Sequence, residues 1–295
     1  MKKLIFVHGR NQQGKDPVGL LSEWTGYAQA GVTSIGHTWP TTLLPEMPFY
    51  GDRLIQLIEQ LDSPTIETAI ERGAGNTDSE LEFRGELLLE IAAQAGISQE
   101  EIEDQFQEDI RRRGGNPEVV ERGPGNWEWV HSILKLLDRT SLGAKVIDGF
   151  TRDVYVYLTK GNVQRKIDEI VRASISNDPC VIVAHSLGSV VAYHILKELD
   201  GPQNITFITV GSPLGIRTIR KHLGVLKMPA RVRHWYNAMD EKDIVALYPL
   251  DDNNFDITPP IKNKTTVDNQ TGEHHGIEGY LKDPDVAQVL YDGLL

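Results

Sequence analysis

Three residues of this chain have side chains that together could perform nucleophilic catalysis: Ser186, Asp243 and His275. A serine hydroxyl is a weak nucleophile and needs a base within hydrogen-bond reach. Imidazole suits this role because its ordinary pKa lies near neutral pH. A carboxylate on the second ring nitrogen fixes the tautomer and stabilises the imidazolium. These requirements make Ser186 a candidate nucleophile, with His275 as a candidate general base and acid and Asp243 as a candidate orienting carboxylate.

The sequence around Ser186 predicts a strand, a sharp turn and a helix. An apolar run rich in β-branched residues, 180–184, is typical of a buried strand, and residues 190–199 have helical spacing. Ala184 and Gly188, two residues either side of Ser186, are small enough for a tight turn. This pattern matches the G-x-S-x-G nucleophile elbow, with alanine in place of the first glycine. A serine that only caps an ordinary helix is the alternative, and the preceding strand argues against it.

Five segments of the chain resemble the α/β-hydrolase superfamily, in particular its lipase and esterase-type members. These segments are KLIFVHG (3–9), AHSLG (184–188), ITFITVGSPLG (205–215), DIV (243–245) and HGIEGYL (275–281). The resemblance covers about residues 1–40 and 150–295 and leaves out the middle of the chain. It implies a mainly parallel sheet flanked by helices, and cleavage of a small-molecule acyl ester through an acyl-enzyme intermediate. The order serine, aspartate, histidine along the chain is the order that this fold uses.

Two of the three candidates have a competitor nearby. Asp240 lies three residues before Asp243, and His274 is adjacent to His275. The resemblance favours Asp243, because the residues after it are similar to those after the acid in lipases. It favours His275 by its spacing to the segment that follows. Side chains of adjacent residues should diverge, so at most one of the two histidines can serve as the base.

An oxyanion intermediate needs hydrogen-bond donors, and backbone N–H groups are the expected source. The residue after the nucleophile, Leu187, should supply one donor. The loop after the first strand should supply the other, from Gly9 or Arg10, and we favour Arg10. A glycine at position 9 would let the chain approach the substrate closely.

Strand and helix patterns alternate over about residues 1–40 and 150–295, which predicts an α/β fold with a mainly parallel sheet. We expect helices near 18–30 and 163–174, and strands at 3–8, 32–37, 154–158, 205–210 and 232–236 in addition to the strand before Ser186. In such sheets a site lies beyond the carboxyl ends of the strands. The candidate residues follow predicted strands, as that rule requires.

We expect one α/β-hydrolase domain over residues 1–295, with an inserted acidic helical cap at 43–150. Residues 63–122 contain 15 acidic and 6 basic side chains, a large part of the net charge of −12. A glycine-rich break at 73–76 separates helical patterns within the insertion.

Tryptophans at the edges of the insertion, Trp39, Trp127 and Trp129, are candidates to line the substrate pocket. Trp127 and Trp129 are two residues apart, so on a helix they point about 200° from each other. We expect one of them to face the site and the other to face the core of the cap.

Composition and motifs exclude several other classes of function. The negative net charge disfavours nucleic-acid binding, which needs a basic surface. The histidines show no metal-ligand spacing, and no glycine-rich nucleotide loop lies between a strand and a helix, so we expect no metal and no cofactor. No apolar run approaches the roughly 18–20 residues that span a bilayer. With a single cysteine there is no internal disulfide, and we expect a cytoplasmic protein without stable membrane insertion.

Other functions remain open at this point. A thioesterase, an amidase or a peptidase would use the same three residues. A protein of another class, a non-catalytic hydrolase-like module whose acidic cap binds a protein partner, would have no need of all three. The acyl chain, the leaving group and the oligomeric state are not specified by the sequence.

Overall fold

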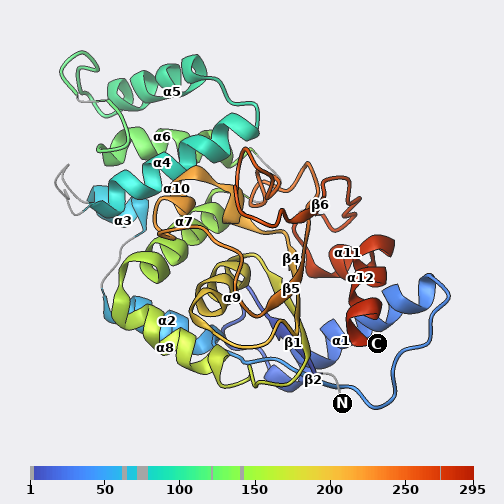
Figure 1. Ribbon diagram of the computed structural model, residues 1–295. Coiled ribbons are helices and arrows are strands. Elements are labelled where there is room, and N and C mark those ends of the chain that lie inside the picture. The colour runs from blue at the N-terminus through green and yellow to red at the C-terminus, as the bar shows by residue number, and fades with distance from the viewer. Residues whose placement is uncertain (1–2, 62–64, 72–78, 121, 140–142, 273) are drawn as a thin grey trace. The chain divides into compact units, whose positions relative to one another are not determined.

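The computed structural model describes residues 3–61, 65–71, 79–120, 122–139, 143–272 and 274–295 (Figure 1). The chain forms two compact units, one of Met1–Leu57 with Asn162–Leu295 and one of Ile58–Gly161. The candidate residues Ser186, Asp243 and His275 all belong to the first unit.

The first unit is built on a six-stranded sheet in which every neighbouring pair of strands is parallel. The strand order is β2-β1-β3-β4-β5-β6. The strands are β1 (Lys3–Val7), β2 (Leu44–Glu46), β3 (Cys180–His185), β4 (Ile205–Val210), β5 (Val232–Ala238) and β6 (Lys262–Lys264). The central strands read as continuous apolar runs because both of their faces are buried. The prediction of an α/β fold with a parallel sheet is confirmed.

Helices cover both faces of this sheet (Figure 1). Helices α1, α11 and α12 pack together, with α12 against β3 and β4, and α9 packs against β1 and β3. The helices of this unit are α1 (Pro17–Ser34), α8 (Gly161–Arg172), α9 (Leu187–Glu198), α10 (Arg217–Arg220), α11 (Ile277–Lys282) and α12 (Pro284–Leu294), with a 3₁₀ turn η1 (Pro213–Gly215). Helix α2 (Gly51–Gln60) leads from this unit into the second.

The second unit contains helices and no strand among its described residues. Its helices are α3 (Ile66–Glu71), α4 (Ser79–Gln94), α5 (Gln99–Arg112), α6 (Trp127–Leu137) and α7 (Ala144–Thr159). Helix α6 packs against the other four, so it forms the centre of the unit. At the start of α5, Ser98 and Glu101 form a reciprocal capping box that satisfies two backbone N–H groups. The glycine-rich break expected at 73–76 lies outside the described residues.

The limits of the second unit differ from the predicted insertion at 43–150. Strand β2 pairs with β1, which places residues 44–46 in the sheet. At the other end, α7 continues to Thr159 and the unit ends at Gly161.

Two predicted strands are wrong. Residues 32–34 belong to α1, in which Val32 packs in the core one turn after Ala28. Residues 154–158 lie in α7, and residues 154–157 are all buried there. A short apolar run cannot by itself distinguish a buried helix from a buried strand.

None of the helices in the part of the chain that the structure describes combines the length and the apolar character needed to cross a bilayer.

Candidate active site

Ser186 occupies a strained turn between β3 and α9. Its backbone has φ 54° and ψ −131°, a conformation that residues other than glycine rarely adopt. Such backbone strain costs about 1–3 kcal/mol and is found preferentially at functional sites. The Ser186 N–H donates to Val210 O at 3.2 Å, and the Ser189 hydroxyl donates to Ser186 O at 2.6 Å. The strained turn is therefore held from both sides.

A second serine, Ser212, supports Ser189 from the loop after β4. The two hydroxyl oxygens are 2.7 Å apart, and both residues are buried. Because Ser189 already donates its proton to Ser186 O, Ser212 must donate to Ser189 Oγ. Ser212 Oγ in turn accepts from the Leu214 N–H at 3.3 Å. The role of this pair was not predicted from the sequence, because no pattern there distinguishes Ser189 and Ser212 from other serines.

The loop after β1 approaches Ser186 closely at Gly9. A Cβ at Gly9 would lie 2.8 Å from Ser186 Cβ and 3.3 Å from Ser186 Oγ, so only glycine fits. Arg10 follows directly and is half-buried. Leu187 is the first residue of α9, where backbone N–H groups have no acceptor within the helix. The predicted oxyanion donors thus lie on the two segments that flank Ser186, and their role stays a prediction.

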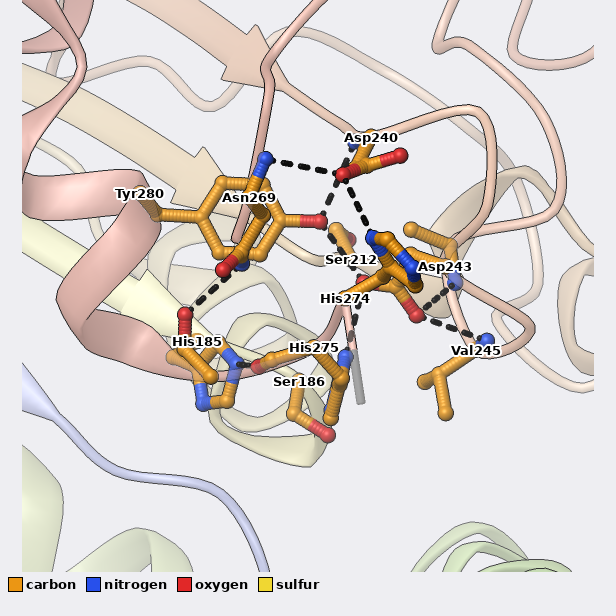
Figure 2. Close-up of polar contacts among 12 residues, drawn as sticks. His185, Ser186, Ser212, Asp240, Asp243, Val245, Asn269, His274, His275 and Tyr280 are labelled. Carbon is orange, nitrogen blue, oxygen red and sulfur yellow. Dashed lines mark hydrogen bonds and ion pairs between the residues drawn. The ribbon is translucent and has the colours of Figure 1, made fainter. Parts of the chain in front are cut away.

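Asp243 and His275 form a hydrogen-bonded pair (Figure 2). The distance from His275 Nδ1 to Asp243 Oδ2 is 2.8 Å, and Asp243 is buried. Asp243 Oδ1 accepts backbone N–H bonds from Val245 at 2.9 Å and Ala246 at 3.3 Å. Burial opposes ionisation of this carboxyl, but His275 and the hydrogen bonds outweigh it and hold the pKa of Asp243 below its usual range. An ionised Asp243 keeps the proton on His275 Nδ1 and leaves the lone pair on Nε2.

Ser186 and His275 belong to the same site, because Nε2 of His185, the residue before Ser186, donates to the backbone oxygen of His275 at 2.8 Å (Figure 2). Ser186 Oγ is buried and has no hydrogen-bond partner among the described residues. A buried hydroxyl without a partner costs free energy, so it needs an explanation. In unliganded active sites the bond between nucleophile and base is often long and tightens only when substrate binds. The geometry is therefore compatible with His275 as the base of Ser186.

The competing residues form a second pair of their own. His274 Nδ1 lies 3.2 Å from Asp240 Oδ2, and Figure 2 shows the His274 ring directed towards Asp240 and away from Ser186. His274 has φ 52°, so the backbone turns sharply between the two histidines. The expected divergence of the adjacent side chains is observed.

Tyr280 connects the two aspartates. Its hydroxyl donates to Asp243 Oδ2 at 2.7 Å and accepts from the Asp240 N–H at 3.2 Å (Figure 2). Burial and the neighbouring Asp243 carboxylate raise the pKa of Tyr280 well above its ordinary value, so the hydroxyl remains a donor. Tyr280 lies in the segment HGIEGYL, but no role for it was predicted from the sequence.

Asn269 holds in place the loop that carries His274 and His275, called the histidine loop below. Its side-chain N–H donates to Gly276 O at 2.8 Å, and its Oδ1 accepts from the Thr271 hydroxyl at 2.6 Å. The Asn269 N–H donates to Asp240 Oδ2 at 2.9 Å. Asp240 thus helps to position the loop that carries His275 through Asn269 and His274. No pattern in the sequence indicates this role of Asn269.

Two further histidines near Ser186 are buried in the neutral form. Burial lowers the pKa of His8 to about 4, and burial together with nearby His275 lowers the pKa of His185 to about 3. His8 Nδ1 donates to Gly9 O at 2.7 Å while its Nε2 accepts from the Tyr50 N–H at 3.1 Å. Protonation of His8 would break the bond from Tyr50, since both nitrogens would then be donors. His185 Nε2 donates to His275 O at 2.8 Å and so supports the backbone of the histidine loop.

The three candidate substrate-binding tryptophans lie in different units. Trp39 is half-buried against the core of the first unit, on the side of α1 and α12. Trp127 and Trp129 are both buried within the second unit, with the Arg84 guanidinium 5.6 Å from the Trp127 ring centre. Their role as pocket-lining residues stays a prediction. In the described part of the chain no group of three or more histidine, cysteine, aspartate or glutamate side chains could hold a metal ion.

Comparison with known proteins gives no match: no family model, no curated protein and no solved structure matches this chain. The function must therefore be inferred from the chemistry of the site.

The buried histidines predict a pH dependence of folding stability. Unfolded histidines titrate near pH 6.5, whereas His8 and His185 protonate only near pH 4 and 3 in the folded chain. Between about pH 6.5 and 4 the unfolded chain binds more protons, so each histidine removes about 1.4 kcal/mol of stability per pH unit. We expect urea unfolding to show full stability above about pH 6.5 and a steady loss as the pH falls through this window, with a shallower loss in His185→Asn. Stability that is flat from pH 6.5 to 4.5 would contradict burial of neutral histidines.

Proposed function

We propose that this protein is a serine hydrolase of the α/β-hydrolase type that cleaves a carboxylic ester through an acyl-enzyme at Ser186. One observation carries the proposal. A buried, unpartnered serine hydroxyl on a strained turn shares the site with a histidine whose Nδ1 is bound to a buried carboxylate and whose backbone oxygen is bound by His185, the residue before the serine. The order of the three residues along the chain and the parallel sheet beneath them support the same reading.

In the first half of the proposed reaction Ser186 Oγ attacks the carbonyl carbon of the ester. His275 Nε2 takes the hydroxyl proton as the new bond forms, and Asp243 stabilises the imidazolium. The carbonyl oxygen becomes an oxyanion, which accepts hydrogen bonds from the backbone N–H groups of Leu187 and Arg10. When the intermediate collapses, the alkoxide leaves with the proton from His275, and the acyl group remains on Ser186 as an ester.

In the second half water replaces the alcohol. His275 takes a proton from water as its oxygen attacks the acyl carbon, and a second oxyanion forms in the same position. Collapse of this intermediate returns the proton to Ser186 Oγ and releases the carboxylic acid. The serine, the histidine and the aspartate end in their starting protonation states, so the cycle balances.

Related acyl bonds would use the same atoms. Thioester, amide and peptide substrates differ in the leaving group, which His275 would protonate in each case. The ester is the substrate class that the family resemblance implies. A panel of acyl nitrophenyl esters of increasing chain length, together with a matched thioester and anilide, distinguishes these classes by kcat/KM.

The nucleophile is tested by Ser186→Ala. We expect this variant to lose ester hydrolysis and labelling by a fluorophosphonate probe, because no other group would form the acyl-enzyme. The fold should survive, since Cβ and the turn are retained. Ser176→Ala, which removes an exposed serine hydroxyl, is the matched control and should keep full activity. Hydrolysis or labelling retained in pure Ser186→Ala protein would refute the assignment.

The two aspartates are separated by isosteric substitutions. Asp243→Asn should lower kcat by about 10⁴-fold, as loss of the orienting aspartate does in serine proteases, because Nδ1 of His275 would no longer be held as a donor. Asp240→Asn should have a much smaller effect, since Asp240 bonds His274 and Asn269. Circular dichroism checks that both variants fold. A larger loss in Asp240→Asn would transfer the catalytic role to the second pair.

A further inference from the structure

A cavity lies at the amino-terminal ends of the central strands, at the opposite end of the sheet from Ser186. It has a volume of about 720 Å³ and is lined by the amino-terminal residues of β3, β4 and β5 and by the last turns of α12. Ser186 follows the carboxyl end of β3, a strand of six residues, so the cavity and the nucleophile are about 20 Å apart. The volume falls within the range of small-molecule sites, about 300–1,000 Å³.

An irregularity in β5 directs two neighbouring side chains to this cavity. Ile205 pairs with Val232 but Thr206 pairs with His234, so Arg233 is an extra residue in β5. Successive strand residues normally point to opposite faces of a sheet. At this bulge Arg233 and His234 are both exposed and both line the cavity. Bulges often serve to redirect a side chain in this way.

The lining carries positive charge in a chain whose net charge is −12. Arg233 and Lys262 are exposed, and neither forms an ion pair with a carboxylate of the described residues. Lys262 Nζ lies 5.7 Å from the ring centre of Tyr236, another lining residue. Asp292, an acidic side chain of the lining, accepts a hydrogen bond from Gln288 at 2.8 Å. The two unpaired cations make the cavity complementary to an anion.

The rest of the lining is largely apolar. Met228, Pro259, Pro260 and Val289 contribute side chains without hydrogen-bonding groups. We propose that this cavity binds a small amphipathic carboxylate, with its apolar body against these side chains and its carboxylate on Arg233 and Lys262. A guanidinium can bind a carboxylate through two parallel hydrogen bonds, which favours this anion. The proposal does not depend on the proposed hydrolase activity.

The four methionines of the chain allow a test that locates the ligand. Met228 lines the cavity. Met239 follows the carboxyl-terminal end of β5 and precedes Asp240, close to the proposed active site. In protein labelled with ¹³C at the methionine methyl groups, decanoate should shift the Met228 signal in a saturable manner and leave Met239 unchanged. Decanol, which has the same chain without the charge, should bind at least tenfold more weakly.

Charge reversal tests the anion site directly. Arg233→Glu with Lys262→Glu should weaken decanoate binding at least tenfold. Lys145→Glu with Arg111→Glu makes the same change in charge at two exposed residues of the second unit and should leave binding unchanged.

Several results would overturn the proposal: equal affinity for decanoate and decanol, a shift at Met239 in place of Met228, or unchanged binding in the charge-reversed variant. If that variant melts at a lower temperature but binds decanoate as before, the role of the two cations is to stabilise the carboxyl-terminal end of α12, where the helix dipole is negative, and they do not form an anion site. Inactivity towards every ester would refute the proposed hydrolase but would leave the Met228 result standing, so the two failures can be told apart.

Discussion

The turn at Ser186 is the constraint to which the rest of the first unit conforms. Its positive φ lifts the hydroxyl out of the sheet, and the turn is tight enough that neighbouring segments touch it. A Cβ at Gly188 would overlap the carbonyl oxygens of Val7 and His8, and a Cβ at Gly9 would meet Ser186. Helix α9 and the loop after β1 are therefore packed at the closest distance that a backbone allows. Parallel pairing of β1 with β3 fixes this approach and offsets the strain.

The electrostatics around the turn concentrate charge on one pair of residues. His8 and His185 are buried and neutral, while Asp243 is buried and has a lowered pKa. A carboxylate in such a place is stable only if hydrogen bonds satisfy it, and Asp243 accepts them from His275, Tyr280 and two backbone N–H groups. A charge in these surroundings acts more strongly on a neighbouring imidazolium than it would in water.

Much of this arrangement could be predicted because it depends on local sequence. The small residues around Ser186 predict the turn. The apolar run before it predicts the strand, and the helical spacing of apolar residues after it predicts the helix. Other roles could not be predicted, because each depends on contacts between segments distant in the sequence. These are the roles of Tyr280, Asn269 and the Ser189–Ser212 pair. Strand β2 was missed because it has three residues, includes Pro45 and lies at the edge of the sheet. The helix α7 was mistaken in part for a strand because residues 154–157 are buried on every side.

In the proposed reaction Ser186 carries the acyl group during turnover. The most direct measurement is acid quenching of the protein during hydrolysis of a slowly deacylated nitrophenyl ester, followed by intact-mass and peptide mass spectrometry. We expect one added acyl group per chain, on the peptide that contains Ser186, formed and lost at rates compatible with turnover. Steady hydrolysis without any acylated chain, or acylation of a different residue, would contradict it.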